Sequence, residues 1–388
     1  MGRLEKLPPY LFSAIDAAKE KARASGVEVV DLGVGDPDMP TPRSLVEFMA
    51  EAITNRSNHC YPAQRGHGAL KQAIAAWLQK RHGVAVDPVS QVLVLIGSKE
   101  GLGHLPLTCV EEGDNTLIPD LGYPVYGQAT LLAGGEPRTF SLTAERNFLP
   151  DLEEIDALCD SHSRMIFLNY PNNPTGAVAG EDFWKQMVEL ARKRNLVLVN
   201  DAAYLEVIND GPRPVSLLQV ADLTKHKVIE LHSLSKMFNM TGWRIAFAAG
   251  HPEVVGALGR VKESMDSGVF TAIQETAAHA LGDAFDELLD SVMAAYPSRR
   301  ATIESALKEA GFEVFHSPAT FYVWARVPAN RVASRSSIEF CSMVLDELGV
   351  VVTPGLGFGT GGEGWFRISL TASDEDIAEG ARRFREWA

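Results

Sequence analysis

Six short apolar stretches, rich in β-branched residues, recur between residues 92 and 249, and each is long enough for one buried strand. They are Val92–Ile96, Thr116–Ile118, Met165–Leu168, Leu196–Val199, Val228–Leu231 and Ile245–Ala249. Helical patterns lie between several of them, as in Phe183–Arg194, where Phe183, Met187, Leu190 and Ala191 fall on one face. This alternation predicts crossover units, and therefore an α/β core in which helices flank a mostly parallel sheet.

The pattern changes after residue 280, where long helical segments dominate. The helices predicted there are Ala284–Ala295, Ser298–Ala310 and Ser337–Leu348, and the strands are Thr320–Ala325 and Phe366–Leu370. We therefore predict two domains. A large domain over residues 45–281 holds the parallel sheet, and a smaller α+β domain combines residues 282–388 with residues 1–44, which include an N-terminal arm.

Composition and charge then limit the kinds of function that the chain can have. Of its 388 residues, 46% are hydrophobic and 22% are charged, which is typical of a globular enzyme. Its 50 acidic and 36 basic residues give a net charge of −14, which disfavours nucleic acid or an anionic membrane as partner. No export signal and no membrane span of roughly 20 apolar residues is evident. The four cysteines form no C-x-x-C pair, so we expect no zinc site or disulfide framework and a cytoplasmic location.

Polar clusters follow five of the predicted strands. They are GSKEG (97–101), PDLGYPVY (119–126), NYPNNPTG (169–176), NDAAY (200–204) and HSLSK (232–236). Ligands of an open parallel sheet bind in the crevice at the carboxyl ends of its strands. We therefore expect these five clusters to meet at one site.

Several residues of these clusters are suited to bind an anion. GSKEG precedes a helical pattern, so its backbone N–H groups and the Ser98 hydroxyl can hold a phosphate at a helix N-terminus. Arg244 adds a forked guanidinium, and Ser233 and Ser235 add hydroxyl groups. The chain lacks G-x-x-x-x-G-K-[ST], and no G-x-G-x-x-G opens the first crossover, so a single phosphate is favoured over a nucleotide.

The lysine at the end of HSLSK completes a set of groups that suits one cofactor. An amine able to form an imine, an acidic residue at the end of a buried strand, an aromatic ring and a monophosphate site are together what pyridoxal 5′-phosphate requires. We therefore predict that Lys236 is the Schiff-base residue. A plain dehydrogenase would need the glycine fingerprint that the chain lacks.

The motifs that carry this set resemble those of the fold-type-I pyridoxal-phosphate aminotransferases of class I/II, and most closely the LL-diaminopimelate aminotransferase branch. The matching stretches are PPYLF (8–12), VGDPDMPTP (34–42), IGSKEG (96–101), GYPVY (122–126), YPNNPTG (170–176), HSLSKMFNMTGWR (232–244), TFYVW (320–324) and GEGWFRISL (362–370). The resemblance covers nearly the whole chain. It implies the fold-type-I transferase fold, pyridoxal 5′-phosphate as cofactor, and a homodimer with its active site at the subunit interface.

The resemblance also implies a role for each residue at the cofactor. Asp201 pairs with the pyridine nitrogen and keeps it protonated, while Asn173 and Tyr204 bond the ring hydroxyl oxygen. Tyr123 stacks on the ring face, and Lys236, once freed, acts as general base and acid at the substrate Cα. The phosphate is held by Ser98, the backbone N–H of Lys99, Ser233, Ser235, Arg244 and Tyr61 of the partner subunit. Lys236, Asp201 and Tyr204 are thus the expected catalytic residues.

One substrate residue follows from strand geometry. In FRISL, alternation places Phe366, Ile368 and Leu370 on one side of the strand and Arg367 and Ser369 on the other. The fork of Arg367 suits the α-carboxylate of an amino acid. By the resemblance, the substrate site also includes Gly35, Tyr10, Tyr123 and Asn173, with Lys99 and Gln64 as candidates for the distal end.

The predicted reaction moves an amino group from an amino acid to a 2-oxo acid in a ping-pong cycle. The branch resemblance implies LL-diaminopimelate and 2-oxoglutarate, or in reverse glutamate and tetrahydrodipicolinate, in lysine biosynthesis. Two alternatives use the same residues: an aminotransferase for aspartate, alanine or aromatic amino acids, and a carbon–sulfur lyase. The ten histidines include no H-E-x-x-H pair, and no metal is predicted.

Overall fold

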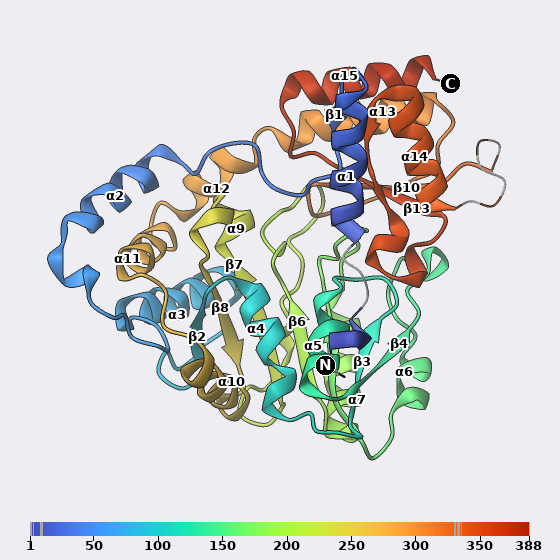
Figure 1. Cartoon of the computed structure of the whole chain (residues 1–388). Coiled ribbons are helices and arrows are strands. Elements are labelled where there is room, and N and C mark those ends of the chain that lie inside the picture. The colour runs from blue at the N-terminus through green and yellow to red at the C-terminus, as the bar shows by residue number, and fades with distance from the viewer. Residues whose placement is uncertain are drawn as a thin grey trace.

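Two main sheets organise the computed structural model, which describes residues 2, 4–7, 11–329, 331, 334 and 336–387. A seven-stranded sheet uses strands from residues 92–250, and a four-stranded sheet uses strands from residues 314–369. Figure 1 shows the C-terminal helices, with α1 (Leu11–Ala24) beside them, gathered at one end of the larger sheet. The predicted α/β class is confirmed, whereas the domain boundaries at residues 45 and 281 stay a prediction.

The larger sheet is mostly parallel. Its strands, in spatial order, are β2 (Val92–Leu95), β8 (Ala246–Gly250), β7 (Val228–Ser233), β6 (Val197–Asp201), β5 (Ser163–Leu168), β3 (Asn115–Pro119) and β4 (Glu136–Phe140). Only β8 runs antiparallel to its two neighbours. All six predicted strands are present. The seventh strand, β4, is not evident from the sequence pattern because its residues, EPRTF, are mostly polar. It forms the sheet edge, where Pro137 is tolerated.

Helices cover both faces of this sheet. The helices between residues 43 and 280 are α2 (Arg43–Thr54), which packs on α11, α3 (Gly68–His82), α4 (Ser98–His104), α5 (Val125–Ala133), α6 (Leu152–Leu158), α7 (Glu181–Arg194), α8 (Leu217–Val220), α9 (Leu234–Met237), α10 (Pro252–Met265) and α11 (Thr271–Ala280). Alternation along β2 shows how the two faces are filled. Val92 and Val94 belong to the core cluster that contains Trp77 of α3. Leu93 and Leu95 belong to a separate cluster with residues of α4 and α10.

The four-stranded sheet is antiparallel and has its own core. Its strands, in order, are β12 (Thr353–Pro354), β13 (Trp365–Ser369), β10 (Tyr322–Arg326) and β9 (Val314–Phe315). The helices of this part are α12 (Phe285–Met293), α13 (Tyr296–Glu309), α14 (Ser337–Leu348) and α15 (Asp374–Glu386). β1 (Val30–Asp31) pairs in parallel with β11 (Val350–Val351), which joins the N-terminal segment to these elements. The strand predicted from residue 320 begins at Tyr322 instead, because Thr320 has a φ of 70° in the left-handed region.

Short elements complete the chain. The 3-10 helices are η1 (Leu4–Lys6), η2 (Arg56–His59), η3 (Pro106–Thr108), η4 (Ala144–Arg146), η5 (Thr241–Trp243), η6 (Gly355–Phe358) and η7 (Thr360–Gly362). Within the described residues, no helix has the length and apolar character needed to cross a membrane. All four cysteines, Cys60, Cys109, Cys159 and Cys341, are free thiols.

A buried polar network joins the central strands just below their carboxyl ends. Glu230 of β7 is fully buried and accepts hydrogen bonds from Asn200 Nδ2 (2.9 Å), Ser216 Oγ (2.5 Å) and the Leu217 N–H (2.8 Å). His232 Nε2 lies 3.0 Å from the same carboxylate. Burial alone would raise the pKa of Glu230, but His232 and the hydrogen bonds outweigh it and hold the pKa below its usual value. The network therefore fixes β6 and β7 relative to one another.

Removing this carboxylate should destabilise the fold strongly. We expect Glu230→Ala to lower the free energy of unfolding by about 3 to 5 kcal/mol, because it leaves buried donors without an acceptor. Urea unfolding followed by circular dichroism measures the change. Glu189→Ala, which removes an exposed partner of Arg192 on α7, serves as the control and should change stability by less than about 0.5 kcal/mol. Equal effects of the two substitutions would contradict the role given to Glu230.

Candidate active site

A cavity of about 500 Å³ lies where the carboxyl ends of the central strands face the four-stranded sheet. The sequence-predicted residues that line it are Gly35, Ser98, Lys99, Tyr123, Asn173, Asp201, Tyr204, Ser233, Ser235, Lys236, Arg244 and Arg367. Two further candidates, Tyr61 and Gln64, are not among its lining residues. Tyr61 is 94% exposed and Gln64 is also exposed, while Tyr10 lies outside the described residues. The clusters that follow the strands thus meet at one site.

Lys236 enters the cavity from the one-turn helix α9. Ser233 ends β7 and caps this helix by accepting the N–H of Ser235 (3.3 Å). The Lys236 amine donates to the carbonyl oxygen of Gly35 (3.0 Å). Burial, assisted by Arg367 and Arg244 and opposed by Asp36, lowers the pKa of Lys236 to about 8. A large part of the amine is therefore neutral, and nucleophilic, slightly above neutral pH.

Asp201 is the last residue of β6 and is almost fully buried. Its Oδ2 accepts a hydrogen bond from the Tyr126 hydroxyl (3.0 Å), whereas its Oδ1 has no partner that meets hydrogen-bond geometry. Burial raises the pKa of Asp201 to about 6, although the Tyr126 hydroxyl and the backbone N–H of Ala203 act in the opposite direction. A buried carboxylate oxygen on the cavity wall suits a cationic N–H donor of a bound ring.

The segment after β5 is held against the end of β6. Asn169 donates from Nδ2 to the carbonyl oxygen of Asp201 (2.6 Å), and its Oδ1 accepts the N–H of Asn173 (2.7 Å). On the opposite wall, the hydroxyl groups of Tyr204 and Tyr322 lie 2.8 Å apart. Burial first, and then Tyr322, raise the pKa of Tyr204 well above its usual value, so its hydroxyl keeps its proton.

Arg367 reaches the cavity from β13, as strand alternation predicts. Phe366, Ile368 and Leu370 pack in the core of the smaller sheet, so the guanidinium lies on the other side. It donates to Asn173 Oδ1 (2.9 Å) and to the carbonyl oxygen of Gly33 (2.8 Å). Its Nε is buried and has no partner, and its side chain is 3% exposed. Among the described residues no carboxylate pairs with this cation, which therefore suits the carboxylate of a ligand.

The start of α4 and Arg244 form the polar end of the cavity. Gly97 precedes the helix with a φ of 77°, and a Cβ there would lie 2.0 Å from Arg244 Nη2, so only glycine leaves room for the guanidinium. Arg244 is fixed by donating from Nη1 to the Thr241 carbonyl oxygen (2.7 Å). Ser98, Ser233 and Ser235 line the same cavity, as an anion site requires.

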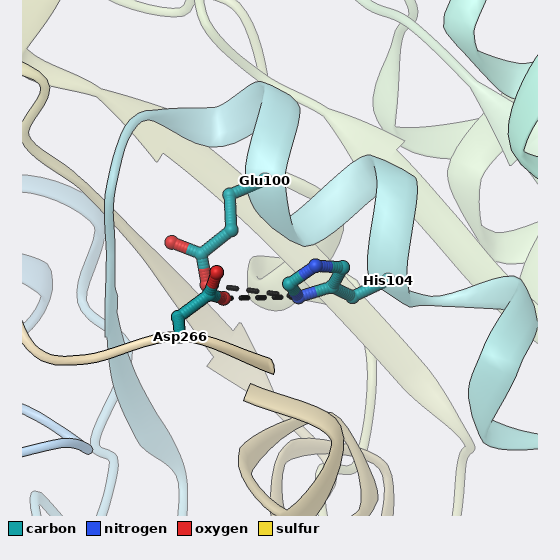
Figure 2. A group of neighbouring side chains, drawn as sticks. All are labelled: Glu100, His104 and Asp266. Carbon is teal, nitrogen blue, oxygen red and sulfur yellow. Dashed lines mark ion pairs between the residues drawn. The ribbon is translucent and has the colours of Figure 1, made fainter. Parts of the chain in front are cut away.

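A group of possible metal ligands lies behind this end of the site. Figure 2 shows Glu100, His104 and Asp266, whose ligand atoms lie within 4.8 Å of one another. Buried Lys262 binds both carboxylate oxygens of Glu100, at 2.9 and 3.1 Å, and therefore supplies the cation of the cluster. Glu100 also accepts the Ile96 N–H, so the cluster anchors the first turn of α4. The absence of a metal stays a prediction.

Sequence analysis did not identify three residues that shape the site. Tyr126, Asn169 and Tyr322 lie within the quoted motifs GYPVY, NYPNNPTG and TFYVW, but received no role. Their tasks depend on contacts between distant segments, as in the Tyr204–Tyr322 pair. The position of each residue within a motif indicates that it lies near the site. It does not show which side chain or backbone group the residue contacts.

Comparison with known proteins adds an independent observation. Residues 27–384 match the family model described as aminotransferase class I and II. A protein named LL-diaminopimelate aminotransferase from Desulforudis audaxviator is 46% identical over 99% of this chain and 96% of its own length. The protein of the same name from Aquifex aeolicus is 44% identical over 99% of this chain and 97% of its own. The substrate-bound structure of BacF from Bacillus subtilis has a TM-score of 0.92 and 35% identity, covering 100% of this chain and 97% of that one.

The raised pKa of Asp201 predicts a pH-dependent stability difference. The folded protein keeps a proton on Asp201 up to about pH 6, whereas the unfolded chain releases it near pH 4. The charged carboxylate therefore destabilises the fold increasingly as the pH rises through this interval. We expect Asp201→Asn to gain about 2 kcal/mol of stability relative to the wild type between pH 4.5 and 7.5, measured by urea unfolding of protein purified free of cofactor. A stability difference that does not change with pH would contradict this assignment, and Asp222→Asn, at the surface, is the control.

Proposed function

The chain belongs to the class I and II aminotransferases, and on that basis we propose that it uses pyridoxal 5′-phosphate to transfer an amino group from LL-diaminopimelate to 2-oxoglutarate. The relatives that carry this substrate in their name match almost the whole chain. The observation that carries the cofactor proposal is an amine with a pKa of about 8 in the same cavity as a buried carboxylate with an unpaired oxygen. In the cell we place this reaction in the cytoplasm, as part of lysine biosynthesis.

The residues of the cavity fit the parts of this cofactor. When bound, pyridoxal phosphate supplies an aldehyde that takes up the amino group and a protonated ring that accepts electrons from the substrate Cα. Asp201 Oδ1 would accept the ring N–H, and Asn173 and Tyr204 would bond the ring hydroxyl oxygen. Tyr123 would flank the ring. The phosphate would be held by Ser98, the backbone N–H of Lys99, Ser233, Ser235 and Arg244.

Lys236 is proposed to carry the covalent and proton-transfer roles. Lys236 would hold the cofactor through its amine, and the amine of an incoming substrate would take its place there, which would leave Nζ free as a neutral base. In that state Nζ accepts the proton from the substrate Cα and later returns it. A pKa close to the working pH suits a group that must both take and give a proton.

Arg367 is proposed to hold the α-carboxylate of the substrate. Its two fixed bonds, to Asn173 and Gly33, set the plane of the guanidinium before a ligand arrives. Arg367 lines the cavity, and no carboxylate of the described residues neutralises its charge, so its guanidinium can pair with a ligand carboxylate. Gly35 lines the cavity near this group, and by the family resemblance Tyr10 adds a contact to the substrate side chain.

We further propose a homodimer in which Tyr61 of the partner subunit completes the phosphate site. The Tyr61 side chain is almost fully exposed in its own chain and does not line its own cavity, so it is free to contact another subunit. A tyrosine hydroxyl can donate to a phosphate oxygen.

The role of Lys236 is tested by removing its amine. We expect Lys236→Ala to lower kcat by at least about 10³-fold, because the nucleophile and the base are lost together. The purified variant should also lose the yellow colour that the lysine-bound cofactor gives the wild type, as read by an absorbance spectrum. Lys225→Ala, which removes an exposed lysine, is the matched control and should leave both properties unchanged. Full transamination by Lys236→Ala would overturn the proposed mechanism.

The substrate is tested with a panel of amino donors and 2-oxoglutarate as acceptor. The panel contains the LL, meso and DD isomers of diaminopimelate together with aspartate, alanine and phenylalanine. We expect the LL isomer to give the highest kcat/KM, with glutamate formation as the measurement. If the LL isomer is inert while aspartate, alanine or phenylalanine reacts rapidly, the specific substrate is wrong and the aminotransferase assignment still stands.

A further inference from the structure

Two oppositely charged side chains of the cavity have no place in the scheme above. Lys19, from α1, and Asp31, the last residue of β1, both line the cavity. Their Nζ and Oδ2 atoms lie 2.9 Å apart, and the side chains are 13% and 22% exposed. Asp36 and Lys99 border the cavity too, but they are exposed, so water screens their charges more strongly. Lys19 and Asp31 are the better shielded pair.

This ion pair lies next to the proposed carboxylate site. Asp31 Oδ1 accepts the N–H of Gly33 (3.0 Å), and the carbonyl oxygen of the same glycine accepts from Arg367 Nη2 (2.8 Å). Thr353 Oγ1 donates to that carbonyl as well (2.8 Å), which fixes the peptide between the two charged sites. Gly33 therefore lies between Asp31 and Arg367. The ion pair would meet one end of a short ligand, and Arg367 would meet the other.

The chemistry of the proposed substrates gives the pair a task. Glutamate and LL-diaminopimelate both carry a distal carboxylate, but only diaminopimelate has an ammonium beside it. One lysine and one aspartate match a distal group that has both charges. A carboxylate has about four acceptor positions, so Asp31 can receive an ammonium while keeping its bond to Gly33. With no ligand, the two side chains neutralise each other, which avoids an unpaired buried charge.

We propose that the Lys19–Asp31 pair recognises the distal end of the substrate, with Lys19 binding the carboxylate shared by both amino acids and Asp31 binding the ammonium unique to diaminopimelate. This inference rests on the proposed function for the identity of that second ammonium. Its selectivity follows from charge, since an amino acid with an apolar side chain would separate or bury the pair without replacing its interactions.

Single substitutions separate the two roles. We expect Asp31→Asn, which keeps an acceptor for the Gly33 N–H, to lower kcat/KM for LL-diaminopimelate by about 10- to 100-fold and to leave glutamate within about threefold. Lys19→Met should lower kcat/KM for both amino acids by about 10- to 100-fold and leave alanine, which has no distal group, unchanged. The half-reactions are measured in the holoenzyme by single-turnover absorbance. Asp222→Asn and Lys225→Met, from an exposed pair at 2.7 Å, are the matched controls.

A purely structural role of the pair gives a different pattern. If Asp31→Asn or Lys19→Met affects diaminopimelate, glutamate and alanine equally, or affects none of them, the proposal is overturned. Binding supplies a second readout that needs no turnover. Calorimetry of the holoenzyme should show tighter binding of glutarate than of butyrate, and Lys19→Met should remove that preference. A preference that persists in Lys19→Met also overturns the proposal.

The same experiments distinguish this inference from the proposed function. A wild-type enzyme that is inert with LL-diaminopimelate refutes the proposed substrate. The distinction between glutamate and alanine, and between glutarate and butyrate, still tests whether Lys19 binds a distal carboxylate. If Asp31→Asn does not fold, the Lys19→Met measurements alone decide whether the pair is a binding site.

Discussion

The low polarity of the cavity floor is the constraint on which the rest of the site depends. Asp201 is buried with one oxygen bonded to Tyr126 and the other without a partner, and Lys236 is half-buried beside the Gly35 carbonyl oxygen. In such surroundings a carboxylate and an ammonium both lose hydration, so the pKa of Asp201 rises and that of Lys236 falls. The ring of the proposed cofactor would relieve both penalties, with a positive N–H at Asp201 and an aldehyde at Lys236. Under this proposal, the unfavourable burial makes the site selective for its ligand.

Three segments that are far apart in the sequence meet at Arg367. The strand β13 carries the guanidinium, the segment after β5 offers Asn173, and the segment after β1 offers Gly33. The first belongs to the smaller sheet, and the second extends from the larger one. Because this guanidinium bonds to the other two segments, it fixes the two sheets relative to one another, and under the proposed function it would also orient the substrate.

The parts of the structure that depend on local pattern were predictable. Runs of β-branched residues located the six strands, and strand alternation placed Arg367 opposite Phe366 and Ile368. The edge strand β4 was missed because a strand with one exposed face and a proline carries little of this signal. The five clusters after the strands indicated where the site lies. The set of groups after the strands assigned Lys236, and the resemblance assigned a role to Asp201; both roles stay a prediction.

Tertiary contacts account for what sequence analysis missed. The hydrogen bond from Tyr126 to Asp201 joins residues 75 positions apart, and the Tyr204–Tyr322 pair spans 118 positions. Lys19 and Asp31 are closer in sequence, but their value as a pair depends on α1 lying over the cavity. A single sequence contains these residues without stating which side chains meet. Such contacts follow only from the tertiary packing of distant segments.

The reversed direction of β8 has a consequence for how the site is assembled. The chain leaves β7 at Ser233, forms α9 and η5 at the carboxyl end of that strand, and returns directly along the neighbouring strand β8. If β8 were parallel to β7, the chain would need a long crossover connection between the two strands. Lys236 and Arg244 would then lie on separate connections. Here Lys236 and Arg244 are carried by one short hairpin-like connection. The spacing between Lys236, the proposed reactive amine, and Arg244, the proposed phosphate ligand, is therefore set by the length of that connection, and an insertion there would displace both groups.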